Sequence, residues 1–401
     1  MPNDHLIERI QEAILRYVGW LDSYGETSYD FQTFYASSVG RKAKALYYKR
    51  PLLGSIAVAP IIFCETFLPS ARRFFWKRQR FPIADAHYAM AFATLSQALG
   101  EKKYYERATH FLAVLEATRC QNQMHYAWGY PFDWVGIGGT IREGTPLVTT
   151  EPYVYEAFSQ VYGIDKNQKW CQIMRSLAQH ASKDYFDVET SPLASRTSYT
   201  PSPEPVGGGV VNASAYRAFL LTKAALDFSE EKYRRQAERN MQFVLESQNP
   251  DGSWYYAMDG RRNFVDHFHT CFVIKALAKI ERLTGDSGCT AAIERGINYY
   301  VRHLFDEGGL PKPFSKAPRL TVYRRELYDY AECINLATLL KGRFPELDER
   351  LKTALDDILI RWQRPDGSFR SRHLLFGWDN VPMHRWAQAQ LFRSLCLLLA
   401  Q

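Results

Sequence analysis

Two kinds of helical segment alternate along the 401 residues of the chain. Six segments are nearly all apolar, and they start roughly 54 to 67 residues apart: IADAHYAMAFATL from Ile83, TEPYVYEAFSQVY from Thr150, VNASAYRAFLLTKAAL from Val211, VDHFHTCFVIKALAKI from Val265, LYDYAECINLATLL from Leu327 and PMHRWAQAQLFRSLCLLL from Pro382. A more polar segment precedes each of them, such as HLIERIQEAILRYVGWLDSY, with its charged residues on one helical face.

This alternation matches the two layers of an α/α toroid. An inner helix is covered on both sides and is therefore apolar all round, whereas an outer helix is covered on one side. The pattern predicts an all-α protein, an (α/α)6 toroid of twelve helices in six hairpins, that forms one domain over residues 1–401. The inner helices are expected to begin near Asp85, Glu151, Asn212, Asp266, Tyr328 and Met383, and the loops before them to open on one face.

The first of these loops, residues 24–82, is long and unusual. Residues 41–80 hold ten basic residues and a single acid, Glu65, in a chain of net charge +7. Between two basic clusters lies PLLGSIAVAPIIFCETFLP, a poor transmembrane helix because Pro60 and Glu65 interrupt it. The segment predicts an anchor on an anionic membrane surface. A loop that packs on the protein's own core is the alternative, and either could bind a polyanion.

Composition narrows the class of protein. Hydrophobic residues make up 46% and charged residues 23%, as in an ordinary globular protein, and 25 Tyr residues suit a cleft that binds sugars. Seven scattered cysteines with no CxxC pair suggest a reducing compartment. The first helix has no secretory-signal pattern, so we expect a cytoplasmic protein, at the inner face of the membrane if the anchor prediction holds.

Two short motifs and several longer segments resemble known toroid proteins. QNPDGSW at Gln248 and QRPDGSF at Gln363 resemble the Q-x-x-D-G-S-W element of terpene-cyclase-like toroids, in which the element is structural. With FPIADAHYAM, WGYPFDW, FVDHFHTCFV, YRRELYDYAECINL and GWDNVPMHRW, the chain resembles toroid proteins encoded in bacterial exopolysaccharide and capsule gene clusters. The architecture is widespread among glycoside hydrolases, polysaccharide lyases and uronyl epimerases. The resemblance therefore implies a carbohydrate-active protein of polysaccharide or glycoconjugate biosynthesis.

Several chemistries lack their motifs. A class II terpene cyclase needs DxDD, and nucleotide sites need GxxxxGK[ST] or GxGxxG after a strand; the sequence has neither. Cys271, Cys333 and His384 could converge on zinc, but nothing in their spacing demands it. His267 and His269 lie two residues apart, on different sides of a helix. We therefore expect no metal, no cofactor and no nucleic-acid partner.

Polar residues at the starts of the inner helices are the candidates for chemistry. A glycosidase needs two carboxyl groups, which Asp133, Asp259, Asp329, Glu332 and Asp379 could supply. A lyase or C5-epimerase needs cations for a uronate and His or Tyr for the proton, which Arg324, Arg325, Tyr330, His267, His269 and Asn212 could supply. For each residue a structural role is the competing interpretation, and Asp85, Asn212 and Asp266 stand where helix caps are expected.

The resulting hypothesis places the site where repeats four, five and six meet. The predicted catalytic residues are Glu332, His269, His267, Tyr330, Asp379 and Asp259. The predicted substrate-binding residues are Arg324, Arg325, Tyr323, Trp254, Asp133, Trp128, Asn212, His384 and Trp378. We expect a hydrolase or lyase that cleaves a glycan, which could be anionic or lipid-linked. A uronyl C5-epimerase and a non-catalytic glycan-binding or assembly protein remain the alternatives.

Overall fold

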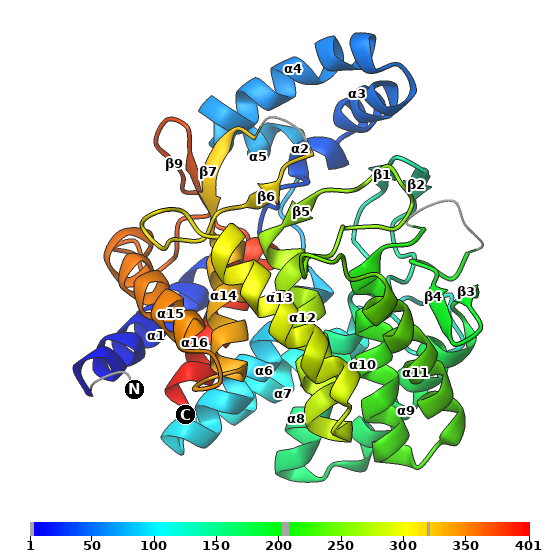
Figure 1. The fold of residues 1–401 in the computed structure, drawn as a ribbon. Helices are drawn as coiled ribbons and strands as arrows, with labels where there is room; N and C mark the ends of the chain where they lie inside the picture. The colour runs from blue at the N-terminus through cyan, green and yellow to red at the C-terminus, as the bar shows by residue number, and fades with distance from the viewer. Residues whose placement is uncertain (1–3, 203–207, 319–320) are drawn as a thin grey trace.

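A computed structural model describes residues 4–202, 208–318 and 321–401 and confirms the (α/α)6 toroid (Figure 1). Residues 203–207 of the predicted loop TSYTPSPEPVGGG lie outside the described residues. The six outer helices in this described part are α1 (Asp4–Tyr24), α7 (Lys102–Ala117), α9 (Gln168–Lys183), α11 (Glu231–Glu246), α13 (Ser287–His303) and α15 (Pro345–Asp357), which continues as a π-helical turn (Ile358–Trp362). The six inner helices are α6 (Pro82–Leu99), α8 (Glu151–Asp165), α10 (Val211–Phe228), α12 (His267–Thr284), α14 (Leu327–Leu339) and α16 (Ala389–Leu399), which follows an irregular turn (His384–Gln388).

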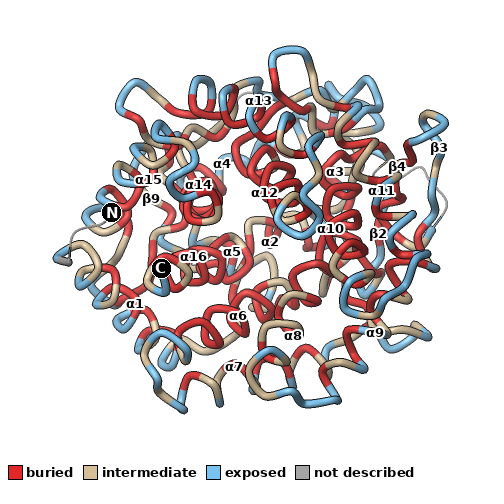
Figure 2. The backbone as a smooth tube through the Cα atoms, turned by 60° about the horizontal axis from the view of Figure 1, so that its bottom comes forward, coloured by how far each residue is buried: buried red, intermediate tan, exposed pale blue. Residues whose placement is uncertain are grey.

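The inner helices form a closed ring. Each packs against the next in the order α6, α8, α10, α12, α14 and α16, and α16 packs in turn on α6 and α1. Figure 2 shows that inner helices are buried along most of their length, whereas outer helices alternate buried and exposed turns. On α9, for example, Trp170, Ile173, Met174 and Leu177 share the buried face, because their spacing follows the helical repeat.

Two turns of the same sequence pattern join neighbouring outer helices. In QNPDGSW, Gln248 Nε2 donates to the carbonyl oxygens of Gly252 (3.0 Å) and of Ala292 in α13 (3.0 Å). In QRPDGSF, Gln363 Nε2 donates to the carbonyls of Gly367 (3.2 Å) and of Ala13 in α1 (2.9 Å). The second turn therefore ties the sixth hairpin to the first helix and closes the outer ring.

Short strands occupy the loops that lead into the inner helices, and most lie over one end of the toroid, which we call the mouth (Figure 1). They are β1 (Trp134–Gly136), β2 (Gly139–Ile141), β3 (Asp187–Ser191), β4 (Ala194–Thr197), β5 (Val265–Asp266), β6 (Phe314–Lys316), β7 (Tyr323–Glu326), β8 (Arg372–Leu374) and β9 (Trp378–Asp379). All strand pairs are antiparallel, in the groups β1–β2, β3–β4, β5–β6 and β7–β8–β9.

The insertion at residues 24–82 is helical rather than a loop. It contains α2 (Thr33–Ala36), α3 (Ser38–Lys49), α4 (Pro51–Phe67), a 3-10 turn (Pro69–Ala71) and α5 (Arg72–Phe75). Helices α3 and α4 form a hairpin that projects from the mouth (Figure 1). Two buried ion pairs fix its base to the β7–β9 sheet: Glu65 with Arg372 and Arg72 with Asp379, each 2.7 Å.

Among the described residues, no single helix has the length and apolar character needed to cross a membrane. Helix α4 and the following segment, Pro69–Phe75, reach those values only when taken together, and the two are bent by 117°.

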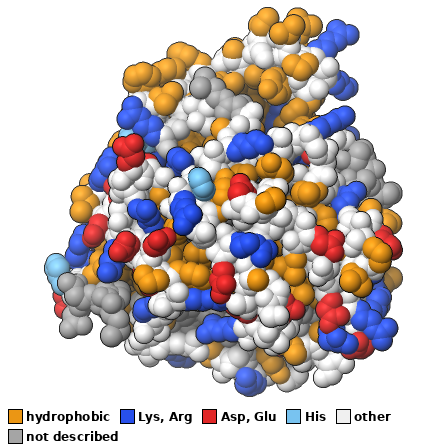
Figure 3. Space-filling model, in the orientation of Figure 1, with side chains coloured by type: hydrophobic (Ala, Val, Ile, Leu, Met, Phe, Trp, Pro, Cys, Tyr) orange, Lys and Arg blue, Asp and Glu red, His pale blue; other side chains and the backbone are white. Residues whose placement is uncertain are grey.

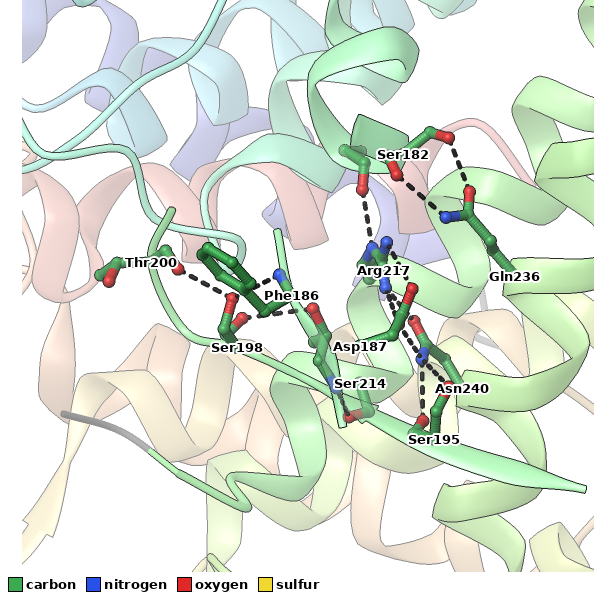
Figure 4. Close-up of polar contacts among 12 residues, drawn as sticks. Ser182, Phe186, Asp187, Ser195, Ser198, Thr200, Ser214, Arg217, Gln236 and Asn240 are labelled. Atoms are coloured by element: carbon green, nitrogen blue, oxygen red, sulfur yellow. Dashed lines mark hydrogen bonds and ion pairs between the residues drawn. The ribbon is translucent and has the colours of Figure 1, made fainter. Parts of the chain in front are cut away.

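One buried cation on an inner helix serves the architecture (Figure 4). Arg217 of α10 donates to the carbonyl of Ala181 (2.7 Å) and to Asn240 Oδ1 of α11 (3.1 Å), and it forms an ion pair with Asp187 of β3. Asn240 donates in turn to the carbonyl of Ser195 in β4 (2.8 Å). This network holds the β3–β4 hairpin against the two helices, so Arg217 points away from the toroid axis.

Candidate active site

A histidine and an aspartate are held together at the start of α12. Asp266 is the N-cap of this helix, because its Oδ1 accepts the backbone N–H of His269 at 2.8 Å. The same turn brings its Oδ2 to 2.5 Å from His269 Nδ1. The cap geometry thus places a carboxylate on one ring nitrogen of an imidazole.

The pair is asymmetric in its exposure. The Asp266 side chain is buried, whereas the His269 side chain is 23% exposed. A carboxylate on Nδ1 stabilises the tautomer that carries its proton there, which leaves Nε2 free to accept a proton from a ligand. His269 therefore has the arrangement of a general base at the mouth.

A small pocket between α10 and α12, with room for about one water-sized group, borders this pair. It is lined by Val211, Asn212, Trp254, Tyr255, Tyr256, Asp266, His269, Thr270 and Val273. Asn212 Oδ1 is buried there and has no partner among the described residues, so it can accept a hydrogen bond from a ligand hydroxyl. The ring of Tyr256 lies edge-on to His269, with centroids 4.6 Å apart, and burial raises the pKa of its phenol.

Two cations stand beside the tyrosines of the pocket. The guanidinium of Arg262 lies 5.4 Å from the Tyr256 ring centroid, and Lys316 Nζ lies 4.6 Å from that of Tyr255. Arg262 also pairs with Asp259, whereas Lys316 is exposed. Since Asp259 neutralises Arg262, Lys316 is the cation that places positive charge at the edge of the pocket.

Aromatic side chains of four inner helices meet next to the pocket, around the toroid axis. The hydroxyls of Tyr153 and Tyr216 are hydrogen-bonded at 2.6 Å, and the Tyr216 ring lies 5.4 Å from that of Phe272. Phe272 lies 5.8 Å from Tyr328 and 5.5 Å from His269. These rings give the mouth an aromatic floor.

Below this floor, charged side chains face one another across the ring. Glu332 of α14 forms an ion pair with Lys275 of α12, and Glu156 of α8 bonds Lys279 at 2.6 Å and lies 3.6 Å from Arg393 of α16. Burial lowers the pKa of Lys279 to about 8. Three cations thus surround two carboxylates.

Sequence reasoning missed both lysines, Lys275 and Lys279, although their spacing from Phe268 and Phe272 places all four residues on one face of α12.

His87 of α6 is a further polar residue at the axis. Both of its ring nitrogens are buried without a partner among the described residues, and its ring lies 4.5 Å from that of Tyr153. Burial lowers its pKa well below the usual value, and the nearby cations add to this effect. His87 is therefore a neutral imidazole at the axis.

Two predicted catalytic residues lie in the core instead. His267 Nε2 bonds the Tyr300 hydroxyl at 2.6 Å and its Nδ1 lies 3.1 Å from the Leu304 carbonyl, while burial lowers its pKa to about 3. Tyr330 donates to Asp357 of α15 at 2.6 Å. Both side chains face outer helices, because a shift of one or two positions along an inner helix turns a residue away from the axis.

Two predicted sugar-binding tryptophans are packing residues. Trp128 and Trp254 are buried, and their Nε1 atoms donate to the carbonyls of Leu115 (2.8 Å) and Val244 (2.9 Å). Trp254 still forms one wall of the pocket. Trp378 stacks on His373 at 4.5 Å, within the β7–β9 sheet.

Predicted polar residues at the fifth and sixth repeats are bound elsewhere. Asp379 belongs to the buried pair with Arg72. His384 bonds the Tyr88 hydroxyl (2.6 Å) and the Gly25 carbonyl (2.9 Å), and burial lowers its pKa to about 4.

The three residues considered for zinc, Cys271, Cys333 and His384, do not converge, because Cys271 and Cys333 face Tyr300 instead. No group suited to a metal ion occurs in the part of the chain that the structure describes.

The remaining predicted residues lie at the surface or in structural contacts. Arg325 pairs with Asp306, and Arg324 is exposed. The Tyr323 ring packs under Arg372, with 4.5 Å from the guanidinium to the ring centroid. Asp133 lies 3.2 Å from Arg142 and 3.4 Å from Arg41, and Asp259 lies 2.6 Å from Arg262. Of the predicted set, the structure brings His269 and Asn212 together in the pocket, beside Trp254, and places Glu332 nearby on the axis.

Comparison with known proteins finds similarity in structure. The sequence matches no known protein family and no curated protein. The structure is similar to cellobiose 2-epimerase from Bacillus thermoamylovorans B4167, with a TM-score of 0.62 and 12% identity over 80% of this chain and 87% of that chain. It is also similar to the unsaturated glucuronyl hydrolase of Bacillus sp. GL1, with a TM-score of 0.64 and 12% identity over 98% of this chain and 96% of that chain. A polysaccharide lyase gives a TM-score of 0.56 and 10% identity over 79% and 85%. These likenesses establish the fold, which is one that carbohydrate-active enzymes use.

Proposed function

We infer that the protein processes a glycan by proton transfer at the mouth of the toroid, with His269 as the base. The observation that carries this proposal is the contact of Asp266 with His269 Nδ1, in a pocket where Asn212 offers an unpartnered acceptor. General base catalysis needs a positioned group that can accept a proton, and the carboxylate of Asp266 holds the His269 imidazole in place for that role. The similarity in fold to an epimerase, a hydrolase and a lyase supports a glycan as the substrate.

The proposed substrate is an acidic sugar, and its reaction begins at a carbon that bears a carboxylate. Lys316, which is exposed beside Tyr255, would offset the charge of that carboxylate, and this acidifies the neighbouring C–H bond. His269 Nε2 takes this proton and leaves the electron pair on the sugar. In a lyase, this electron pair forms the new C4=C5 double bond while the C4–O4 bond breaks, and the leaving oxygen takes a proton. In an epimerase, a proton returns to C5 from the other face.

Tyr256 is the proposed proton donor for the lyase outcome, in which the leaving oxygen takes a proton. Its ring is next to His269, and its raised pKa keeps the phenol protonated at neutral pH. After donation, the proton held on His269 restores the phenol through solvent at the open side of the pocket. Both groups thus end the cycle in their starting states.

Hydrolysis by two carboxyl groups has less support from the geometry. Four carboxylates are already in ion pairs with Arg or Lys side chains, namely Asp133, Asp259, Asp379 and Glu332. Asp329 is fully buried with neither oxygen partnered among the described residues, and burial raises its pKa well above the usual value. Four of the five carboxyl groups considered for a glycosidase are therefore already held in ion pairs.

The test is incubation with a panel of neutral and uronate-containing bacterial polysaccharides in deuterated water. Unsaturated ends or deuterium at C5 support the proposal and separate lyase from epimerase. Replacement of His269 by Gln should lower the rate by at least about a hundredfold. His110→Gln is the matched control, because His110 also bonds a carboxylate, Glu26 at 2.8 Å, but lies on outer helix α7.

A second pair of variants separates the charge of Asp266 from its role as a helix cap. Asp266→Asn keeps a capping oxygen but removes the charge beside His269, so activity should fall by about 10²- to 10⁴-fold with little change in thermal stability. Asp266→Ala should lose both. Chain shortening without unsaturated ends or deuterium would show hydrolysis, and full activity of His269→Gln would show that His269 is not the base; either result overturns the proposal.

A further inference from the structure

The outward face of α4 has an unusual composition for a surface helix. Glu65 is the single charged residue of α4, and it is buried in its ion pair with Arg372. Ser55 is the one exposed residue of α4 with a polar side chain. The exposed residues are Pro51, Leu52, Leu53, Ser55, Ile56, Ala59, Pro60, Ile62, Phe63 and Phe67. Leu52 is 87% exposed and Ile56 is 73% exposed. A helix in contact with water normally presents charged side chains on such a face.

The apolar surface extends beyond α4. Leu68 and Phe74 follow it in the chain, and both are exposed. From the β8–β9 turn, Phe376 reaches the ring of Phe67 with centroids 6.0 Å apart, while 71% of Phe376 stays exposed. Figure 3 shows hydrophobic side chains gathered over the projecting top of the molecule. Continuous apolar surface of this kind marks a site of interaction.

Free basic residues stand at both ends of this surface. Lys49 ends α3 and Arg50 connects it to α4; Arg73, in α5, and Lys77 follow the 3-10 turn after α4. All four are exposed, and none forms an ion pair with the residues that the structure describes. Lysine and arginine beside an exposed apolar helix are typical of segments that lie in an anionic membrane interface.

Three other basic residues of the insertion are structural. Arg72 is buried against Asp379, and Arg78 donates to the carbonyls of Tyr24 (2.8 Å) and Thr27 (3.0 Å from Nε). Arg80 pairs with Glu26 and with Asp85. Changes at these positions would disturb the fold, so a test of surface charge has to use exposed residues such as Lys49, Arg50, Arg73 and Lys77.

We propose that the α3–α4 hairpin docks the protein on an anionic lipid bilayer, with the outer face of α4 lying in the plane of the interface. Its 17 residues extend about 26 Å, less than the roughly 30 Å of a hydrocarbon core, and its inner face packs on α3. The helix therefore lies on the bilayer rather than across it. A second copy of this chain is a poorer occupant, because face-to-face helices would bring basic ends together in either direction.

Docking in this way turns the mouth toward the membrane. The base of the hairpin is bound to the β7–β9 sheet, which lies at the mouth end (Figure 1). If the proposed function holds, the pocket at His269 would meet glycans carried on lipids at the bilayer surface. The docking itself does not depend on the reaction, and its test contains no glycan.

The experiment is co-sedimentation of the full chain with phosphatidylcholine vesicles, with and without phosphatidylglycerol. Wild-type protein should sediment with the anionic vesicles at low salt and less at high salt. The triple variant L52E/I56E/F63E should bind at least about tenfold more weakly, because apolar contact is lost and negative charge is added. L193E/L226E/I360E is the matched control, since these exposed residues lie outside the hairpin.

Two further measurements test geometry and charge. The variant I56W should be quenched by brominated lipid tails when anionic vesicles are added, because Ile56 points outward from α4. The variant K49E/R50E/R73E/K77E should weaken binding to anionic vesicles by at least about tenfold. Circular dichroism must show that each variant is folded.

Three results would overturn the proposal. The first is wild-type protein that stays in the supernatant with both kinds of vesicle. The second is equal binding by L52E/I56E/F63E and its control. The third is a wild-type dimer in light scattering that becomes monomeric in L52E/I56E/F63E without any vesicle binding, which would assign the surface to a second copy.

Discussion

Replacement of Gly367 by Ala tests whether the QRPDGSF turn closes the ring. Gly367 has a φ of +93°, and a Cβ there would lie 2.3 Å from the carbonyl oxygen of Arg16 in α1. The turn would have to move away from α1. That movement would break the bond from Gln363 to Ala13 and the bond from Arg16 to the Arg364 carbonyl (3.0 Å).

The cost can be worked out from these contacts. A side chain in the left-handed region costs about 1–2 kcal/mol. Each lost hydrogen bond costs about 1 kcal/mol, so the total is about 3–4 kcal/mol. An entropy of unfolding of about 2.1 cal/mol/K per residue gives about 0.8 kcal/mol/K for 401 residues. The Tm should therefore fall by about 4–5 °C.

Gly377→Ala is the matched control. Gly377 has a φ of +75°, but a Cβ there meets nothing within 4 Å. It should incur the backbone strain alone, with a fall in Tm of about 1–2 °C. Thermal unfolding followed by circular dichroism measures both variants. Equal falls in Tm would show that contact between this turn and α1 adds nothing to stability, and the account of ring closure given above would be wrong.

Two other predictions concern buried charges. Arg217→Met should lower the free energy of unfolding by about 2–4 kcal/mol in urea titrations, because it leaves Asp187 and two buried acceptors without their donor, while vesicle binding stays unchanged. Burial lowers the pKa of His180, but Glu151 (3.0 Å) and Asp184 (2.6 Å) outweigh it, so the pKa is raised. The charged imidazole therefore stabilises the fold fully below about pH 6.5, and this contribution is lost as pH rises through the folded-state pKa. His180→Gln should flatten that part of a plot of stability against pH. A plot as steep as that of the wild-type protein would contradict the assignment.

The sequence predicted the toroid because the two kinds of helix differ in composition. A helix buried on both sides is apolar all round, whereas a helix buried on one side has a polar face. The expected helix starts at Glu151, Asn212 and Asp266 lie within one residue of the observed ones. The insertion was expected to be a loop because it connects the first outer helix to the first inner helix, while Pro60, Glu65 and the flanking prolines argued only against a transmembrane helix. In the structure Pro51 begins α4, where a missing N–H costs nothing, and Pro60 lies on the exposed face of the helix.

The site was less predictable because its residues differ from core residues only in orientation. His267 and His269 stand in the same motif, and only the second faces the pocket. Tyr328 lies near the axis while Tyr330 packs on α15. An inner helix is apolar on every side, so its hydrophobic pattern does not tell which side faces the axis. The ion pair of Asp379 with Arg72 joins distant parts of the chain, and that of Arg325 with Asp306 joins the two ends of the connection between α13 and α14, so neither has a local signal in the sequence.

The closed ring has a consequence for the connectivity of the chain. Helix α1 packs on α16, so the first and last helices are neighbours, and no hairpin of the ring is an end in space (Figure 1). A circular permutant could therefore join these two helices by a short linker and open the chain at the turn of Lys341 and Gly342 between α14 and α15, where a Cβ on Gly342 would meet nothing. The order in which the six hairpins are synthesised would then change, while every neighbour in the folded ring would remain the same.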